Sequence, residues 1–392
     1  MSTYKYAIIG GGMSANAAIG GIRNEDPDGS IVMVSAEADR PYDRPPLSKG
    51  LWTGDSEIDD IVHEIPGGVD FYSGRRIRSF SIPRREMIDD EDLTYRFDKL
   101  LLATGGRPKH LPFDAHSQIL YYRTLRDYVH LRDLTARYDK FAVIGGGFIG
   151  SELAAALRMN GKDVTIVFPE EGICAALFPA DLVEHLNEYY QDKGVAVRSR
   201  TSVMGLTGEQ GDYLLETEDG GPIEAEVIVA GIGITPNTEL AEDAGLQVEN
   251  GILVNDELQT SAPNIYAAGD VANFMDHLLG ERRRVEHEDN AVTMGRSAGR
   301  SMAGANIDYD YSPMFYSDLF DLGYEAVGEL DAGLDTFADW QEEFRKGVIY
   351  YMDQGRMRGV LLWNVWDKVD EARDVIATKK TWRHSELDGL IA

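Results

Sequence analysis

Two glycine clusters are the residues whose spacing points most directly to chemistry. They read Gly10-x-Gly12-x-x-Ala15 and Gly145-x-Gly147-x-x-Gly150. Glycines at these intervals permit a tight turn and let the backbone approach a pyrophosphate, which then lies at the N-terminus of the following helix. Such a motif is a weak signal alone. It predicts dinucleotide binding when a strand precedes it and a helix follows it.

Both clusters have that context. Each follows a short apolar run typical of a buried parallel strand, and each leads into a stretch of small residues and then a second apolar run. The expected strand, helix and strand span residues 6–9, 13–22 and 31–34 in the first copy, and 141–144, 148–159 and 164–168 in the second. The duplicated βαβ pattern predicts two doubly wound α/β units.

An acid after the second strand of each unit is the expected ribose ligand. Glu37 is the candidate in the first unit, although it follows Gly10 at more than the usual ~20 residues, and a solvated loop acid is the alternative. Glu170 directly follows the strand at 164–168. No arginine stands beside it in the sequence, which favours NAD over NADP.

The remaining chain predicts a three-domain α/β protein. Two dinucleotide folds in one chain are commonly filled by a bound FAD and an exchangeable nicotinamide cofactor. Apolar runs at 99–106, 226–233 and 264–270 each reach glycine, and after residue 314 two strands within 346–366 and a helix over 367–378 are expected. The predicted domains are an FAD domain at 1–118 and 251–314, an NAD(H) domain at 119–250, and a C-terminal α+β domain at 315–392.

The proline-rich segment at 41–49, PYDRPPLSK, predicts an extended and stiff backbone. It is either a rigid linker or a wall that presents Arg44 and Lys49 to the flavin. Flavoproteins that work through a redox disulfide, an NADH oxidase or an NADH peroxidase mechanism would carry a redox cysteine at position 49. Because a lysine stands there, electrons cannot pass through a cysteine at that point.

Several motifs together resemble a known family, the glutathione-reductase-like (pyridine nucleotide-disulfide) flavoproteins, and within it the apoptosis-inducing factor branch. RPPLSK at 44–49 and ATGGRP at 103–108 are also typical of monooxygenase-type ferredoxin reductases. The motifs closer to apoptosis-inducing factor are GGGFIGSEL with FPE at 145–170, RVEHEDNA at 284–291, MFYSDLFDLGYEAVG at 314–328 and GVLLWN at 359–364. The resemblance runs nearly end to end.

The resemblance implies a reductive site. Lys49 matches a lysine that pairs with a glutamate, here Glu152, over the flavin N5 edge, and Phe148 matches an aromatic that covers the flavin. The implied reaction is hydride transfer from NADH to flavin N5. The other implied contacts are Thr104, Gly105, Asp270, Glu286 and His287 toward FAD, and Gly231 and Gly233 toward NAD.

The resemblance leaves the electron acceptor open. One hypothesis is an apoptosis-inducing-factor-like NADH oxidoreductase that turns over slowly, senses redox state and changes its oligomeric state on reduction, with a homodimer as a candidate assembly. Others are a reductase for a ferredoxin or rubredoxin, a flavin-bound docking protein controlled by NADH, and a monodehydroascorbate-type reductase. The family's ribose acid falls on Ala36, and Tyr316 replaces a tryptophan. The long regulatory insertion has no room, so a cell-death role is not carried over.

Composition limits the possible partners and the cellular compartment. The chain has 67 acidic and 38 basic residues, a net charge of −29, which excludes nucleic acid and anionic membranes as partners. A solvated surface, adaptation to salt and a basic partner all remain as reasons for this charge. One cysteine excludes an internal disulfide and a cysteine zinc site and favours a reducing compartment. We expect a cytoplasmic protein without a signal peptide, membrane span or metal site.

Overall fold

The computed structural model describes residues 2–114 and 118–391. The chain divides into two compact units. The first contains residues 1–44, 58–107 and 235–313, and the second contains residues 45–57, 108–234 and 314–392. The boundaries of the three domains expected from the sequence stay a prediction.

The first unit is built on a seven-stranded sheet. Its order is β3-β2-β1-β6-β5-β4, and β18 also pairs with β6. Strands β3, β2, β1, β6 and β18 are parallel, while β5 and β4 form an antiparallel edge. The bounds are β1 (Ser2–Ile9), β2 (Ile31–Val34), β3 (Val69–Tyr72), β4 (Ile77–Ser81), β5 (Glu86–Asp89), β6 (Thr94–Leu102) and β18 (Ile265–Ala267).

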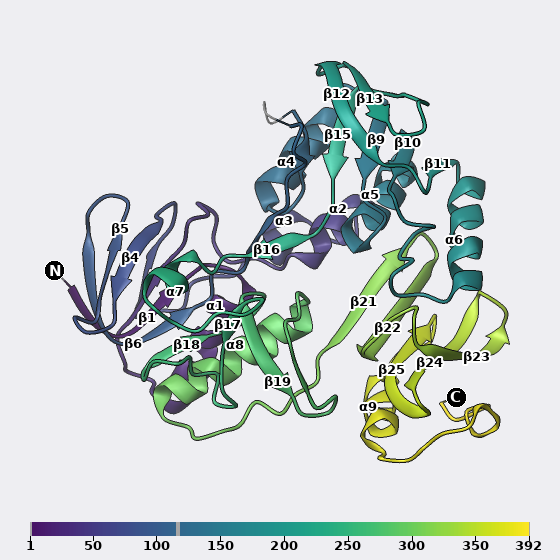
Figure 1. Ribbon diagram of the computed structural model, residues 1–392. Coiled ribbons are helices and arrows are strands. Elements are labelled where there is room, and N and C mark those ends of the chain that lie inside the picture. Colours follow the sequence, from purple (N-terminus) through teal and green to yellow (C-terminus); the bar gives the residue numbers. More distant parts are fainter. Residues whose placement is uncertain (1, 115–117, 392) are drawn as a thin grey trace. The chain divides into compact units, whose positions relative to one another are not determined.

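Helices α1 (Met13–Glu25) and α8 (Glu288–Ala303) lie side by side in this unit (Figure 1). Their backbones approach closely because glycine occupies the contact positions. A Cβ added at Gly295 would lie 2.3 Å from the Ser14 carbonyl oxygen, and one at Gly299 would lie 2.1 Å from that of Ala18. Larger residues would separate the helices. Smaller elements are α3 (Ile58–Ile61), α7 (Glu239–Asp243), β17 (Ile252–Leu253), β19 (Ala272–Asp276) and β20 (Glu281–Arg283).

The second unit contains a five-stranded parallel sheet of order β11-β10-β9-β15-β8. Its strands are β8 (Leu120–Tyr121), β9 (Lys140–Ile144), β10 (Asp163–Val167), β11 (Val195–Arg198) and β15 (Val227–Ala230). Helices α4 (Leu125–Thr135), α5 (Phe148–Met159) and α6 (Ala180–Asp192) accompany it. A three-stranded sheet of β12 (Val203–Glu209), β13 (Asp212–Thr217) and β14 (Ile223–Ala225) adds a further layer. Where the chain passes from one unit to the other, β7 (Gly106–Pro108) pairs with β16 (Ile234–Pro236).

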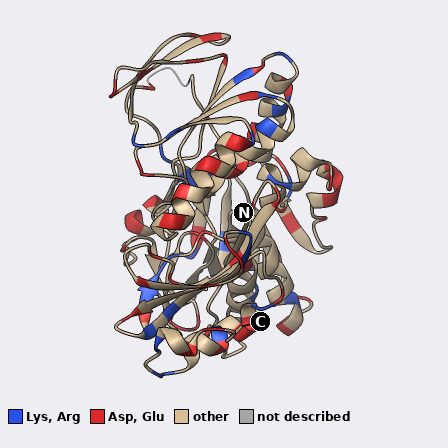
Figure 2. Cartoon of the chain, turned by 90° about the vertical axis from the view of Figure 1, so that its right-hand side faces the viewer, with Lys and Arg blue, Asp and Glu red and all other residues tan. Residues whose placement is uncertain are grey.

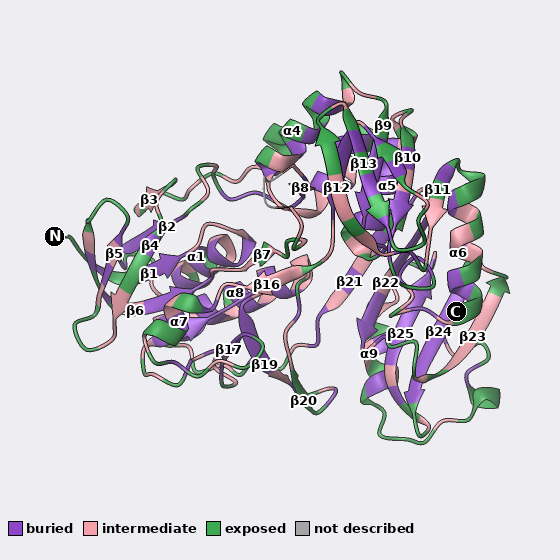
Figure 3. Cartoon of the chain, turned by 45° about the horizontal axis from the view of Figure 1, so that its top comes forward, coloured by how far each residue is buried: buried purple, intermediate pink, exposed green. Residues whose placement is uncertain are grey.

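The C-terminal part of the second unit is a five-stranded antiparallel sheet of order β21-β22-β25-β24-β23. The strands are β21 (Met314–Leu319), β22 (Leu322–Gly328), β23 (Asp335–Glu342), β24 (Lys346–Asp353) and β25 (Arg356–Trp363), and α9 (Val369–Ala377) packs on β22 and β25. Tyr324 and Trp363 stack inside it with ring centroids 5.8 Å apart. Figure 3 shows the buried strands and the exposed outer faces of the helices.

The fold class expected from the sequence is confirmed, and the helices at 13–22 and 148–159 are found as α1 and α5. The extended backbone expected over 41–49 is wrong for its second half. Pro45–Ser48 form a 3-10 helix and Gly50–Thr53 form the short helix α2. Proline fixes φ near −65°, a value that suits the first turn of a helix as well as an extended chain.

Acidic residues are spread over the chain rather than gathered in one segment (Figure 2). Within the described residues, no helix has the length and apolar character needed to cross a membrane, and no group of three or more metal-ligating side chains forms a cluster.

Candidate active site

The first glycine turn follows β1 at the carboxyl edge of its sheet. Gly10 has φ +124°, and a Cβ there would lie 2.1 Å from the Ala103 carbonyl oxygen, so only glycine fits. Gly12 is the N-cap of α1, and among the described residues no side chain caps that helix. Ala15 is buried in its first turns. The backbone N–H groups of the turn are therefore available to an anionic ligand.

Three side chains meet beside this turn. Arg44 Nη2 lies 2.5 Å from Glu37 Oε1, and Tyr42 donates its hydroxyl to Glu37 Oε2 at 2.6 Å. A Cβ on Gly12 would lie 4.0 Å from Arg44 Nη2, which places the guanidinium over the turn. Burial disfavours the Arg44 charge, but Glu37, Tyr42 and Asp270 outweigh it and raise the Arg44 pKa.

Asp270 reaches the same region from the end of β18. A Cβ on the preceding Gly269 would lie 2.2 Å from Ser14 Oγ, in the first turn of α1. Arg284 donates to the Asp270 carbonyl oxygen at 3.1 Å and pairs with Glu286 at 2.5 Å. His287 is the N-cap residue of α8.

Thr104 and Gly105 follow β6 in this unit. Thr104 Oγ1 donates to the Asn237 carbonyl oxygen at 2.8 Å, and Asn237 N–H donates to the Gly105 carbonyl oxygen at 2.9 Å. Of the residues expected to hold FAD, all but Lys49 lie in the first unit, and Lys49 lies in the second.

The second glycine turn repeats the design after β9. Gly145 has φ +112°, and its Cβ would lie 2.5 Å from the Gly231 carbonyl oxygen; a Cβ on Gly150 would lie 1.9 Å from the Gly145 carbonyl oxygen. Gly147, the N-cap of α5, faces open space. Gly233 has φ +88° and continues from Gly231. This cradle fits a pyrophosphate that approaches the backbone closely.

Glu170 is exposed just beyond β10. The structure places Arg200 beside it, a neighbour that the sequence order concealed: Arg200 N–H donates to the Glu170 carbonyl oxygen at 2.7 Å, and the guanidinium pairs with Glu171 at 3.1 Å. An acid at this position suits the free 2′-hydroxyl of NAD, while an arginine suits the 2′-phosphate of NADP.

The predicted pair of Lys49 and Glu152 is formed within the second unit. Lys49 Nζ lies 2.5 Å from Glu152 Oε1, with 14% of the lysine and 3% of the glutamate side chain exposed. Two serines that the sequence interpretation missed also donate to this carboxylate, Ser48 at 2.5 Å and Ser317 at 2.6 Å. Each serine is the sequence neighbour of a residue already singled out, Ser48 of Lys49 and Ser317 of Tyr316, and this adjacency was the only hint of their role in the sequence.

Aromatic residues stand on α5, which carries Glu152, and on β21, which carries Ser317. Phe148, at the start of α5, packs edge to face on Phe315 with centroids 5.7 Å apart. Lys49 Nζ lies 5.3 Å from the Tyr316 ring centroid, which is within the range of a cation–π contact.

Cys174 is buried near Glu152. Burial raises the pKa of its thiol to about 12, and the Glu152 charge adds to the effect while Ser151 opposes it. A thiol with this pKa stays protonated at neutral pH and is a poor nucleophile. With a lysine at position 49, no cysteine is available for a disulfide relay.

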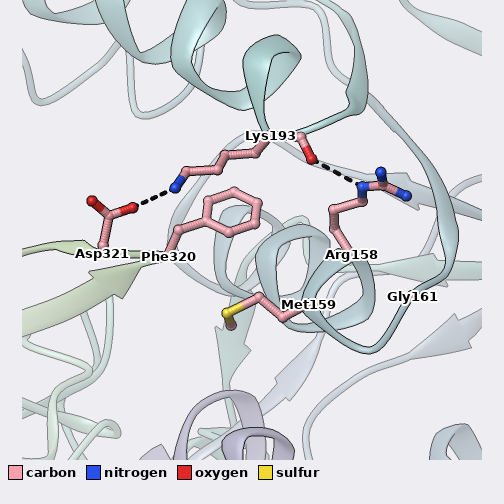
Figure 4. Close-up of a pocket in the computed structure, with 6 residues that line it drawn as sticks. All are labelled: Arg158, Met159, Gly161, Lys193, Phe320 and Asp321. Atoms are coloured by element: carbon pink, nitrogen blue, oxygen red, sulfur yellow. Dashed lines mark hydrogen bonds and ion pairs between the residues drawn. The ribbon is translucent and has the colours of Figure 1, made fainter.

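A surface pocket of about 530 Å³ lies at the far end of α5 (Figure 4). It is lined by Arg158, Met159, Gly161, Lys193, Phe320 and Asp321. Lys193 Nζ donates to Asp321 at 2.6 Å, and Arg158 Nε donates to the Lys193 carbonyl oxygen at 2.9 Å. These contacts tie α6 to the turn between β21 and β22.

Comparison with known proteins agrees with this geometry. Residues 4–295 match the pyridine nucleotide-disulphide oxidoreductase family. The chain belongs to this family. Residues 298–342 and 338–378 also match the C-terminal family of mitochondrion-associated apoptosis-inducing factor.

Individual relatives fall into several groups. The chain is 34% identical to mitochondrial apoptosis-inducing factor 1 of Dictyostelium discoideum, over 96% of this chain and 79% of that protein. It is 34% identical to the ferredoxin–NAD(+) reductase component of the anthranilate 1,2-dioxygenase system of Burkholderia cepacia, over 86% of this chain and 84% of that protein. It is 31% identical to monodehydroascorbate reductase 3 of Arabidopsis thaliana, over 92% of this chain and 89% of that protein.

Among solved structures, the chain resembles that of the covalent putidaredoxin reductase–putidaredoxin complex. The TM-score is 0.90 with 28% sequence identity, and the match covers 99% of this chain and 96% of the other. The protein is therefore an FAD-dependent pyridine nucleotide oxidoreductase, as the sequence resemblance implied.

Proposed function

We propose that this protein is an apoptosis-inducing-factor-like, redox-sensing oxidoreductase that prefers NADH, with Lys49, Glu152 and Phe148 of the second unit as its reductive residues. We also propose that His287, in the first unit, contacts the flavin. The observation that carries the proposal is the buried Lys49–Glu152 pair. A buried charge pair is costly to maintain, so its retention beside a glycine turn favours a role in chemistry.

The residues of the first unit fit FAD. The Gly10 turn and the start of α1 suit its pyrophosphate, Arg44 adds a positive charge there, and Glu37 suits a ribose hydroxyl. Asp270 suits the ribityl hydroxyls. When bound, FAD supplies an acceptor for the hydride of NADH. The remaining FAD contacts in this proposal are Gly12, Ala15, Thr104, Gly105, Glu286 and His287.

The residues of the second unit fit NAD(H). Gly145, Gly147 and Gly150 hold the pyrophosphate, Gly231 and Gly233 form the second edge, and Glu170 binds the adenine ribose. Lys49, paired with Glu152, offers a positive group where negative charge develops during reduction.

A second candidate function is reduction of a small electron-carrier protein. The fold match to the putidaredoxin reductase complex and the identity to a ferredoxin–NAD(+) reductase component favour it. We also propose a cytoplasmic location, because the single cysteine is buried and unpaired as expected in a reducing compartment. For the redox-sensing function, we propose a homodimer as the assembly.

Rapid mixing of the purified yellow protein with NADH, and separately with NADPH, tests these proposals. Without oxygen, NADH should bleach the flavin faster than NADPH. If the bleached form and a long-wavelength absorption band then persist in air, the redox-sensing function is supported. Rapid recovery of colour with one [2Fe–2S] ferredoxin or rubredoxin would instead support a carrier reductase. Failure of both nucleotides to bleach the flavin would contradict both functions.

A further inference from the structure

The Glu152 carboxylate is held by three donors inside the second unit. Lys49 Nζ and Ser317 Oγ share Oε1, at 2.5 and 2.6 Å, and Ser48 Oγ donates to Oε2 at 2.5 Å. Only 3% of the Glu152 side chain is exposed. Because water cannot replace a lost donor at a buried carboxylate, each of these contacts affects the ionised group strongly.

The three donors come from two distant segments. Ser48 and Lys49 are neighbours at the end of the 3-10 helix, whereas Ser317 lies on β21, in the C-terminal sheet. Ser317 is fully buried and is fixed by the β-ladder opposite Tyr324. A rigid strand therefore carries this donor, which is the arrangement that positions a functional side chain best.

Ser317 contacts the carboxylate rather than the ammonium group. The Ser317 hydroxyl and Lys49 Nζ both contact Oε1. The hydroxyl therefore fixes the rotation of the carboxylate, and with it the position of the oxygen that the Lys49 ammonium group contacts. The adjacent Tyr316 ring lies 5.3 Å from Lys49 Nζ. The C-terminal strand thus touches both members of the pair.

We propose that Ser317 is a positioning residue of the reductive site, acting on Lys49 through Glu152, so that the C-terminal sheet is a working part of the oxidoreductase. This inference rests on the proposed function of the Lys49–Glu152 pair. It assigns a role to a segment whose sequence otherwise suggests only an appended domain.

The test compares Ser317→Ala with Ser317→Thr, which keeps the hydroxyl, and with the control Ser301→Ala, which removes another buried hydroxyl, in α8. We expect Ser317→Ala to slow NADH-driven flavin bleaching by about tenfold at saturating NADH, with FAD content and the NADH dissociation constant unchanged. Ser317→Thr and Ser301→Ala should bleach at nearly the normal rate. A normal rate for Ser317→Ala would overturn the inference.

A double-mutant cycle supplies a second readout, the thermal unfolding midpoint of the FAD-loaded protein. Ser317→Ala should lower the midpoint alone but not in a Glu152→Ala background, because its partner is then absent. Full additivity would contradict the inference. If Ser317→Ala does not fold, Ser317→Cys, which keeps a weak donor, replaces it in the same cycle. If Lys49→Ala itself bleaches normally, the proposed function fails, while the cycle still reports whether Ser317 and Glu152 are coupled.

Discussion

Lys49 Nζ lies 2.5 Å from Glu152 Oε1, with the glutamate side chain buried and 14% of the lysine side chain exposed. The lysine follows the proline-rich segment, and the glutamate stands in the helix after the second glycine turn. Both residues lie in the second unit, where their contact joins the end of the proline-rich segment to the helix after the second glycine turn. Removing one partner leaves the other charge buried and unpaired, which makes the pair a sharp target for mutation.

Lys49→Ala and Glu152→Ala should each slow flavin reduction by NADH about 10- to 100-fold, because each removes positive charge or its orientation at the site of reduction. FAD content should fall much less. Lys162→Ala is the matched control, since Lys162 is 15% exposed and pairs with Asp139 at 2.8 Å at the far end of α5. Stopped-flow absorbance measures the rate. Two variants that reduce at the normal rate would exclude the proposed pair.

Glu170→Ala should weaken the preference for NADH over NADPH by about tenfold, because a charged hydrogen bond to the 2′-hydroxyl is lost. Arg200, whose N–H donates to the Glu170 carbonyl oxygen and whose guanidinium pairs with Glu171, is the candidate cation for a 2′-phosphate in this variant. Any increase in NADPH use that Glu170→Ala causes should therefore disappear in the double variant Glu170→Ala/Arg200→Ala. The ratio kcat/KM for the two nucleotides measures the effect, and an unchanged ratio in Glu170→Ala would place the ribose elsewhere.

Gly10→Ala should destabilise the protein by roughly 2 kcal/mol or more and reduce FAD retention, because the new Cβ would meet the Ala103 carbonyl at a positive φ. Gly20→Ala, in helix α1 after the turn, is the control. Gly20 is exposed with open space around it, so alanine there should stabilise the protein by about 0.5–1 kcal/mol. Chemical denaturation and the flavin-to-protein absorbance ratio report both effects. Equal stability of the two variants would contradict the packing of the turn.

Asp321→Asn should destabilise the protein in a pH-dependent way. Lys193, Tyr189 and Arg345 donate to Asp321 and hold the pKa of that carboxyl well below its usual range, against burial. A lowered folded pKa gives stability that is present above the unfolded value of ~3.9 and is lost as pH falls through the folded value. The difference in unfolding midpoint between wild type and variant should thus be largest near pH 6 and shrink toward pH 3. A constant difference over that range would show that the charge is not responsible.

Local sequence determined much of this protein. The alternation of apolar runs, glycines and small residues predicted α1 and α5 and the strands beside them, because buried parallel strands and tight turns restrict residue type at each position. Glycine at positions 10 and 145 is favoured by positive φ values that few other residues adopt, which is a local property of the backbone. The proline run misled because the fixed φ of proline is compatible with both a helical turn and an extended chain.

Tertiary structure alone decided the partners. No spacing in the sequence predicts that Ser317 donates to Glu152, or that Arg200 lies beside Glu170, because hydrogen bonds depend on distances below about 3.5 Å between segments far apart in the chain. The residues of each glycine turn are local and could be read from their order. The surroundings of Lys49 and Glu152 depend on how strands and helices pack, and only the folded chain fixes them.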